Sequence, residues 1–279
     1  MSLRNASEQL DKEPESTPFD CVKIPLAIPM TNRDESTKFP IVPTGESGFE
    51  QSGAIHSFLE HLMTYSFAIL LMANLYVAIG WLHGHGRLWA LLIVAPLSWA
   101  LADFITGLVH WFADTYGSEK TPVLGSLIKP FRLHHIYPRD ICNHNLAVTI
   151  GNSCLLAVPV LCILLYAVAT DSKVSIVKAI LATGLTLLAT GTVVTNVFHR
   201  WAHAEKTSRV VQLLQGCYVI LGRDHHELHH ARPFSSNYCI TVGWLNHLLD
   251  RISFFRRLET VLAKLGLNPA DDCLHERRQ

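Results

Sequence analysis

Four apolar runs, each long enough to cross a lipid bilayer, constrain the fold of this chain more than any other feature of its sequence. A helix needs about 20 apolar residues to span the hydrocarbon core, and nearly uncharged runs of that length are typical of transmembrane helices. We therefore expect an all-α integral membrane protein with about four transmembrane helices. The predicted spans are residues 62–81, 88–111, 146–169 and 174–198.

The composition of the chain excludes two broad classes of protein. Hydrophobic residues make up 49% of it and charged residues only 16%, whereas roughly a quarter of a soluble protein is charged. The formal net charge is +0 and no basic stripe with interleaved aromatic residues occurs, so we expect no nucleic-acid partner. The 7 cysteines are odd in number, form no CxxC pair and lie partly within apolar runs, which argues against a disulfide framework.

Three regions are expected along the chain. Residues 1–55 are rich in Ser, Thr, Glu and Pro, and such a segment cannot bury enough apolar surface to fold, so we predict a disordered cytosolic N-terminal tail. No basic segment followed by an apolar one opens the chain, so no cleaved signal peptide is expected. A membrane domain at residues 56–265 and a loose C-terminal tail at residues 266–279 complete the prediction.

The segment after the fourth apolar run contains no further predicted span. Residues 207–221 are too short and too mixed to cross a membrane, and an interfacial or packed helix is expected there. Residues 232–257 form an amphipathic stretch with aromatic anchors, which we expect at the membrane surface.

Clustered histidines are the main chemical signal. The six-residue stretch HHELHH at residues 225–230 holds four imidazoles, and on a helix side chains three or four positions apart lie on one face, with Cβ atoms about 5–6 Å apart. Neutral imidazole is the commonest protein ligand for metals near pH 7. Other histidines are also clustered, including an HxxxH pair. The candidate metal ligands are His110, His134, His135, His144, His199, His203, His225, His226, His229 and His230.

An even number of predicted crossings separates all of these histidines, so they are expected on one side of the membrane. Most Lys and Arg residues lie on that same side, whereas the opposite side carries Arg87, Lys173 and Lys178. The positive-inside rule makes the histidine-bearing side cytosolic. The predicted fold is therefore a four-span bundle with a histidine-rich helical cap on its cytosolic side, where both termini also lie.

The second apolar run carries three ionisable residues on one face. Asp103 and His110 are seven positions apart, and His110 and Asp114 are four apart. Ionisable groups at membrane depth are costly and usually face the bundle interior, where they are candidates for a functional site. The alternative for Asp103 is a structural carboxylate that caps a neighbouring helix.

The number and type of ligands indicate a metal pair. A zinc site uses three or four ligands, so ten histidines are too many for one ion and about right for two. Ligation by nitrogen with few carboxylates suits iron, copper or zinc better than calcium or magnesium. Iron with open positions activates oxygen, and a site at the membrane edge can receive a lipid chain. The hypothesis is oxidation of an unactivated C–H bond on a lipid.

The histidine boxes resemble those of the membrane fatty-acid desaturases and hydroxylases, since His199 and His203 form HxxxH and residues 226–230 contain HxxHH. Five motifs in order, GLVHWFADTYGS, PFRLHHIYPRDICNHN, FHRWAH, HHELHH and ITVGWLNHLLD, resemble the Kua family more closely. That family includes plasmanylethanolamine desaturases and plastid phosphatidylglycerol desaturases. The resemblance covers about residues 90–260.

The resemblance implies 1′,2′-desaturation of the ether-linked alkyl chain of plasmanylethanolamine to the vinyl ether of a plasmalogen, at the endoplasmic reticulum membrane. It implies two Fe ions, O2 as oxidant, and electrons from cytochrome b5 and its reductase. The ten histidines are carried over as metal ligands, with His225 either a tenth ligand or a group that orients one. Asp103, Asp114 and Asp224 are predicted to orient ligands or contact substrate. No catalytic residue is predicted beyond the metal site.

One departure from the histidine-box pattern and several rival functions stay open at this stage. The first region has no HxxxH box, only His110 with Asp114, and His247 lies outside the boxes. A lipid hydroxylase or an acyl-chain desaturase could use the same metal site. A membrane zinc hydrolase, a metal carrier and a non-catalytic scaffold are further alternatives. The head-group preference, the oligomeric state and the histidines that bind each ion are not fixed by the sequence.

Overall fold

The computed structural model describes residues 53–270, and within this range the regular structure is entirely helical. The helices, with two short 3-10 turns, are α1 (Ala54–Gly84), η1 (Leu88–Ala90), α2 (Leu91–Thr115), α3 (Gly125–Ile136), η2 (Asp140–Asn143), α4 (Leu146–Ala169), α5 (Ile176–His203), α6 (Arg209–Gly216), α7 (Arg223–His229), α8 (Asn246–Arg251) and α9 (Phe254–Lys264). The tail predicted at residues 1–55 lies outside the described residues up to residue 52, as do residues 271–279.

Four of these helices are long and apolar enough to cross a membrane, which confirms the predicted fold class. Helix α5 packs against α1, α2 and α4 and is the central element of the bundle. Small residues permit the closest approaches, because a Cβ added at Gly191 of α5 would come within 2.6 Å of Ala102 of α2. Polar side chains also join the helices, as where Asn74 of α1 donates to the carbonyl of Leu161 in α4 at 3.0 Å.

The outward faces of the spanning helices are apolar. Met72 of α1, Leu92 of α2 and Leu156 of α4 are 67%, 80% and 77% exposed. A contiguous apolar surface of this extent is unfavourable in water and stable against lipid tails. The chain is therefore a multi-pass membrane protein.

The first spanning helix begins earlier than predicted. It starts at Ala54 rather than near residue 62, because no helix-breaking residue lies between these positions. In the added part of this helix Glu60 is buried against α4, where a Cβ at Gly151 would come within 2.8 Å of the Glu60 backbone.

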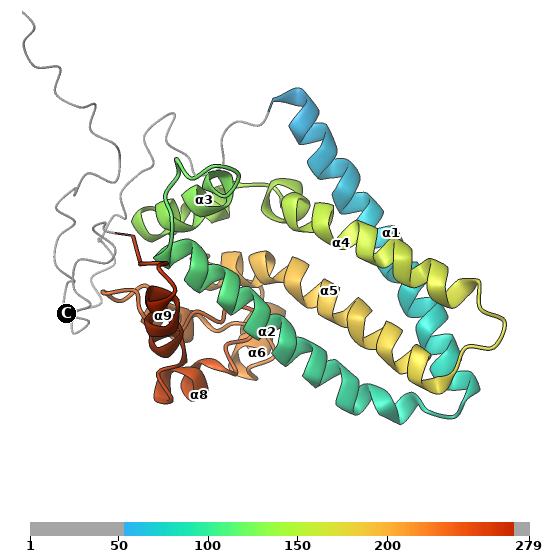
Figure 1. Cartoon of the computed structure of the whole chain (residues 1–279). Coiled ribbons are helices and arrows are strands. Elements are labelled where there is room, and N and C mark those ends of the chain that lie inside the picture. The colour runs from blue at the N-terminus through green and yellow to red at the C-terminus, as the bar shows by residue number, and fades with distance from the viewer. Residues whose placement is uncertain (1–52, 271–279) are drawn as a thin grey trace, which may run out of the picture.

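The histidine-bearing segments gather at one end of the bundle (Figure 1). Helix α2 ends there, α4 begins there and α5 ends there, and α3 and α6 to α9 cover that end. The turns that join α1 to α2 and α4 to α5 lie at the opposite end. The expectation that an even number of crossings brings the histidine clusters to one end is confirmed.

The segment before α8 differs from its predicted position. Residues 236–245, which we call the inner loop, were expected at the membrane surface, but Tyr238, Cys239 and Thr241 in it are fully buried. The loop packs against α2 and α5, since the Thr241 hydroxyl contacts those of Thr106 and Thr195 at 2.9 and 2.6 Å. The surface prediction was wrong because the segment's apolar residues face the helix bundle rather than lipid.

Candidate metal centre

Eight of the ten predicted histidine ligands lie in two adjacent groups at the histidine-bearing end of the bundle. In each group, one potential ligand atom per residue lies within 4.8 Å of all the others. The five-histidine group is His134, His199, His203, His226 and His230. The aspartate group is His110, Asp114, His135 and His229.

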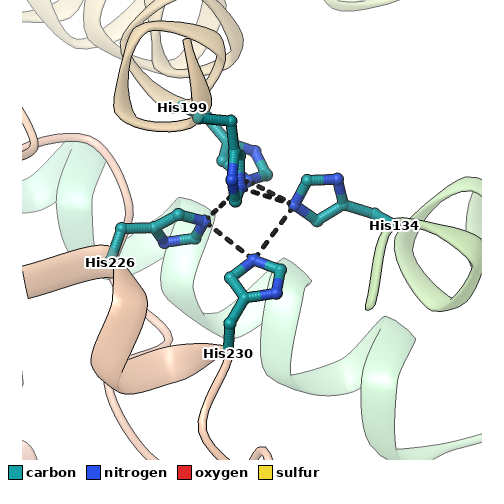
Figure 2. Close-up of side chains that lie close together, drawn as sticks. His134, His199, His226 and His230 are labelled. Atoms are coloured by element: carbon teal, nitrogen blue, oxygen red, sulfur yellow. Dashed lines mark hydrogen bonds between the residues drawn. The ribbon is translucent and has the colours of Figure 1, made fainter. Parts of the chain in front are cut away.

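In the five-histidine group, the ring nitrogens point toward a common centre (Figure 2). The Nε2 atom of His134 lies 2.8 Å from that of His199, and 2.9 and 3.2 Å from those of His203 and His230. Each Nε2 atom carries either one proton or one lone pair, so it cannot form a full hydrogen bond to several neighbours at once. A cation at the centre would satisfy all the lone pairs, and the nitrogen arrangement fits one.

Helical spacing produces this convergence. His199 and His203 are four residues apart on α5, and His226 and His230 are four apart at the end of α7. Side chains at that spacing lie one above the other on a single helix face. Helix α3 contributes His134 from the opposite side. The group is therefore built from three separate helices, α3, α5 and α7.

The aspartate group is built around one carboxylate. The Oδ2 atom of Asp114 lies 2.9 Å from His135 Nε2, 3.3 Å from His110 Nε2 and 3.6 Å from His229 Nε2. All four side chains are buried. The Nε2 atoms of His110 and His229 and the Oδ1 atom of Asp114 make no hydrogen bond within the described chain. A buried polar atom left in that state costs about 1–3 kcal/mol, and a metal ion bound between these atoms would remove the cost.

Two pairs of consecutive histidines contribute one residue to each group. On α3, His134 belongs to the five-histidine group and His135 to the aspartate group. Around the end of α7, His230 and His229 are divided in the same way. The rings of His135 and His230, one from each group, have centroids 5.1 Å apart. The two groups are therefore adjacent, are built on the same two helices, α3 and α7, and fit a pair of neighbouring ions.

Backbone carbonyls of the inner loop orient two ligands of the aspartate group. The Nδ1–H group of His110 donates to the Tyr238 carbonyl at 3.2 Å, and that of His229 donates to the Ser236 carbonyl at 2.8 Å. A proton held on Nδ1 leaves the lone pair on Nε2, which faces Asp114. The buried Nδ1 atoms of His135 in the aspartate group and of His226 in the five-histidine group have no hydrogen-bond partner in the described chain.

Four imidazoles outside the spanning helices have a lowered pKa. Burial lowers the pKa of His134, His226, His229 and His230 well below the ordinary value, and neighbouring histidines lower it further. These rings are therefore neutral near pH 7. A donor set of eight imidazoles and one carboxylate favours iron, copper or zinc over calcium or magnesium.

The remaining predicted site residues lie outside both groups. His144 is 3.4 Å from Asp140, four residues earlier, at the turn before α4, and is in neither group. The Nε2 atom of His225 lies 3.3 Å from the side-chain amide of Asn246, because His225 faces α8 rather than the ion sites. Asp224 and His247 are exposed. His225 is in neither group, and its role as a tenth ligand or as an orienting group stays a prediction.

Asp114 has a more direct position than predicted. It was expected to orient a ligand, but its carboxylate lies among three imidazoles as a candidate ligand itself. The sequence signal for this position was that Asp114 lies four residues after His110 on the same helix and therefore shares its face. The carbonyls of the inner loop had no sequence signal, because any residue type supplies them. The ligand assignments stay a prediction.

Comparisons with known proteins agree with this arrangement. A lipid desaturase domain model matches residues 99–272, which include every member of both groups. The chain is similar to a plasmanylethanolamine desaturase of Myxococcus xanthus, with 39% identity over 186 residues, 66% of this chain and 65% of that protein. It is also similar to plasmanylethanolamine desaturase 1 of Mus musculus, with 40% identity over 191 residues, 65% of this chain and 69% of that protein.

A plant relative is more distant. The chain is 33% identical to the chloroplastic fatty acid desaturase 4 of Arabidopsis thaliana over 179 residues, 61% of this chain and 51% of that protein. The match thus spans about two thirds of the bacterial and mouse relatives and half of the plant one. No solved structure matches this chain.

Proposed function

The chain belongs to the lipid desaturase family, and we propose that it forms the 1′,2′ vinyl-ether double bond in the alkyl chain of plasmanylethanolamine. Two relatives of about 40% identity that carry the name plasmanylethanolamine desaturase support this substrate. The observation that carries the proposal is the pair of adjacent ligand groups at one end of a four-span bundle. This arrangement suits oxidation of a chain that is itself in the membrane.

We further propose that the two groups hold two Fe ions. Iron with nitrogen and carboxylate ligands and open positions supplies O2-dependent oxidation of unactivated C–H bonds. In the overall reaction the alkyl chain loses one hydrogen from each of two adjacent carbons, and a C=C bond forms next to the ether oxygen. One O2 takes these two hydrogens, two electrons and two protons, and yields two waters. Cytochrome b5 and its reductase would supply the electrons.

The surroundings of the aspartate group suit an alkyl chain. His110 is one residue after Val109, whose side chain is 41% exposed on the apolar outer face of α2. A lipid tail beside α2 therefore lies close to the ligand groups, while its head group stays at the polar end of the bundle. Because His110, Asp114 and His229 are buried, bulk water is excluded from the reacting region.

We place the protein in the endoplasmic reticulum membrane with the ligand groups and both termini on the cytosolic side. Lys129, Arg132, Arg139 and Arg200 lie at the histidine-bearing end, while Arg87, Lys173 and Lys178 lie at the opposite end. The excess of basic residues favours the cytosol for the histidine-bearing end. Reduced cytochrome b5 would reach the ions from that side.

Ether-lipid profiling of cells that lack the protein tests this proposal. The wild-type chain should restore vinyl-ether lipids, His229→Ala should not, and His247→Ala, exposed and outside both groups, should restore them fully. Equal restoration by wild type and His229→Ala would refute the site. Hydroxylated lipid without a new alkene would favour a hydroxylase, and an altered double bond in acyl chains would favour an acyl-chain desaturase. Purified protein with a single zinc ion would favour a hydrolase.

A further inference from the structure

The inner loop is non-helical backbone at the depth of the spanning helices. It packs against the stretch of α2 that contains Leu101 and Val109, whose side chains are 46% and 41% exposed on the apolar outer face. Hydrocarbon offers no hydrogen-bond partners, so irregular backbone at this depth is stable only where protein groups satisfy its N–H and C=O groups. The partners of the inner loop therefore decide whether it can stay in place.

Asp103 accepts hydrogen bonds from four N–H groups of the inner loop. Its Oδ1 atom accepts hydrogen bonds from the backbone N–H groups of Thr241, Val242 and Gly243 at 3.0, 2.9 and 3.0 Å. Its Oδ2 atom accepts from the N–H group of Leu245 at 3.4 Å. The carboxylate is fully buried. Leu245 is also the N-cap residue of α8, so the Asp103 carboxylate binds backbone at the start of a neighbouring helix, in agreement with the structural alternative from the sequence.

Two further contacts fix the rest of the inner loop. The side-chain amide of Asn246 bonds both backbone groups of Cys239, since its oxygen accepts from the N–H at 2.8 Å and its nitrogen donates to the C=O at 2.8 Å. On α2, Gly107 leaves room for the same residue, because a Cβ there would come within 2.6 Å of the Cys239 sulfur. The loop thus fits one position against α2.

We propose that Asp103 is a positioning residue for the aspartate group and acts through the inner loop. Asp103 holds residues 241–245, and the same loop presents the carbonyls that bind Nδ1 of His110 and His229. Asp103 contacts neither an ion nor the lipid. It fixes the direction of two metal-binding nitrogens, one on His110, seven residues later on α2, and one on His229 of α7. The proposal rests on the metal pair proposed above, but not on the identity of the lipid.

The effect of Asp103 should be selective. The five-histidine group takes its ligands from α3, α5 and the end of α7, whereas His110 and His229 depend on carbonyls of the inner loop. Loss of the Asp103 contacts should therefore weaken the aspartate group first. Outer partners of metal ligands typically change metal affinity by about 10-fold to 100-fold.

The test uses purified full-length Asp103→Asn and Asp103→Ala, with Glu60→Gln as the matched control. Glu60 is also a buried carboxylate in a spanning helix, but it packs against α4 and not against the inner loop. The first measurement is iron bound per chain, with Mössbauer spectra of the bound iron. The second, which needs no metal, is labelling of Cys239 by a membrane-permeant thiol reagent. Burial raises the pKa of the Cys239 thiol, so the wild-type loop should label slowly.

Asp103→Asn keeps one acceptor oxygen and should give a folded protein in which the inner loop is partly loosened. Asp103→Ala should loosen the loop further. We expect Cys239 to label at least about tenfold faster because the loop opens locally, while Cys154, buried in α4, stays protected. The affinity of the aspartate group for iron should fall by about 10-fold to 100-fold, so less iron is bound there, while the spectrum of the five-histidine group should persist. Glu60→Gln should match wild type in iron content, Mössbauer spectrum and Cys239 labelling.

Three results would overturn the proposal. Wild-type protection of Cys239 in Asp103→Asn and Asp103→Ala would show that Asp103 does not hold the loop. An open loop with the wild-type iron content and spectrum would show that the loop does not position the ligands. Equal loss of iron from both groups would show a general structural role. A wild-type chain that binds two Fe ions but makes no vinyl ether would instead refute the proposed function and leave this inference standing.

Discussion

The two ligand groups lie side by side but are held in different ways. The five-histidine group uses imidazoles alone, and helical spacing on α5 and α7 places most of them. The aspartate group includes a carboxylate and depends on hydrogen bonds that its imidazoles donate to carbonyls of the inner loop. For His110 the accepting carbonyl, that of Tyr238, is 128 residues away along the chain. Local spacing therefore places four of the five ligands of one group as two pairs, while the orientation of the other group depends on long-range contacts with the inner loop.

The groups also differ in charge and access. Asp114 brings a negative charge to one group only, and a hard oxygen ligand favours more highly charged ions than imidazole does. All four members of the aspartate group are buried, whereas His134, His203 and His230 of the other group are only half-buried. Two ions bound here would be inequivalent, and each prediction below tests that difference.

The largest effect is expected from removal of one ligand from each group. His226→Ala and Asp114→Ala should each lower vinyl-ether formation by more than about 100-fold, because loss of a direct ligand exceeds the loss from its outer partners. Each variant should keep the ion of the other group, measured as iron per chain. His247→Ala serves as the control. If Asp114→Ala kept its activity, the comparison would fail, since Asp114 would then not be a ligand.

A smaller loss is expected from Gly107→Ala. The added Cβ would lie 2.6 Å from the sulfur and 3.2 Å from the Cα of Cys239, so the inner loop must move. Overpacking of this kind costs about 1–3 kcal/mol of stability. Activity should fall about tenfold through the aspartate group alone. Gly80→Ala, where a Cβ meets nothing within 4 Å, is the matched control, and an equal loss in both variants would contradict the role of the loop.

Chelation should separate the groups by rate. A chelator should remove the ion of the half-buried five-histidine group several-fold faster than that of the buried aspartate group, because the latter requires local opening. Release of iron with time should therefore show two phases. In Asp114→Ala only the fast phase should remain. A single phase in the wild-type protein would mean that burial does not distinguish the sites.

The smallest effect is expected from His144→Ala. His144 lies beside Asp140 and outside both groups, and substitutions away from a site usually change free energies by within about 0.5 kcal/mol. Vinyl-ether formation should therefore stay within about threefold of wild type. A loss as large as that of His226→Ala would add His144 to the five-histidine group and make the two groups still less equal.

The sequence predicted the bundle and much of the five-histidine group. Span length, crossing parity and i,i+4 spacing are local properties, and they were sufficient to bring residues 199–203 and 226–230 to the same end. The aspartate group was predicted less well. The sequence showed that His110 and Asp114 share a helix face. It did not show that the Asp114 carboxylate lies among the imidazoles as a candidate ligand.

The contacts that sequence reasoning missed are long-range and use backbone atoms. The carbonyls of Ser236 and Tyr238 orient imidazoles, yet the identity of these residues does not encode that role. The same holds for the amides that meet Asp103. His144 was predicted as a ligand from its histidine-rich stretch; in the structure its ring lies beside Asp140 and outside both groups, and its role stays a prediction.

The long separation between Asp103 and its donors has a consequence for biosynthesis. The amide of Thr241 is made 138 residues after the carboxylate that it binds. At ordinary translation speeds of about 5–20 residues per second, α2 spends roughly 7–28 seconds in the ribosome-bound chain before those amides exist. During that interval the helix carries a carboxylate that resists entry into lipid, so stable integration of α2 waits for the C-terminal third of the polypeptide. Chains truncated before the inner loop should consequently be recognised as incomplete within the bilayer and degraded.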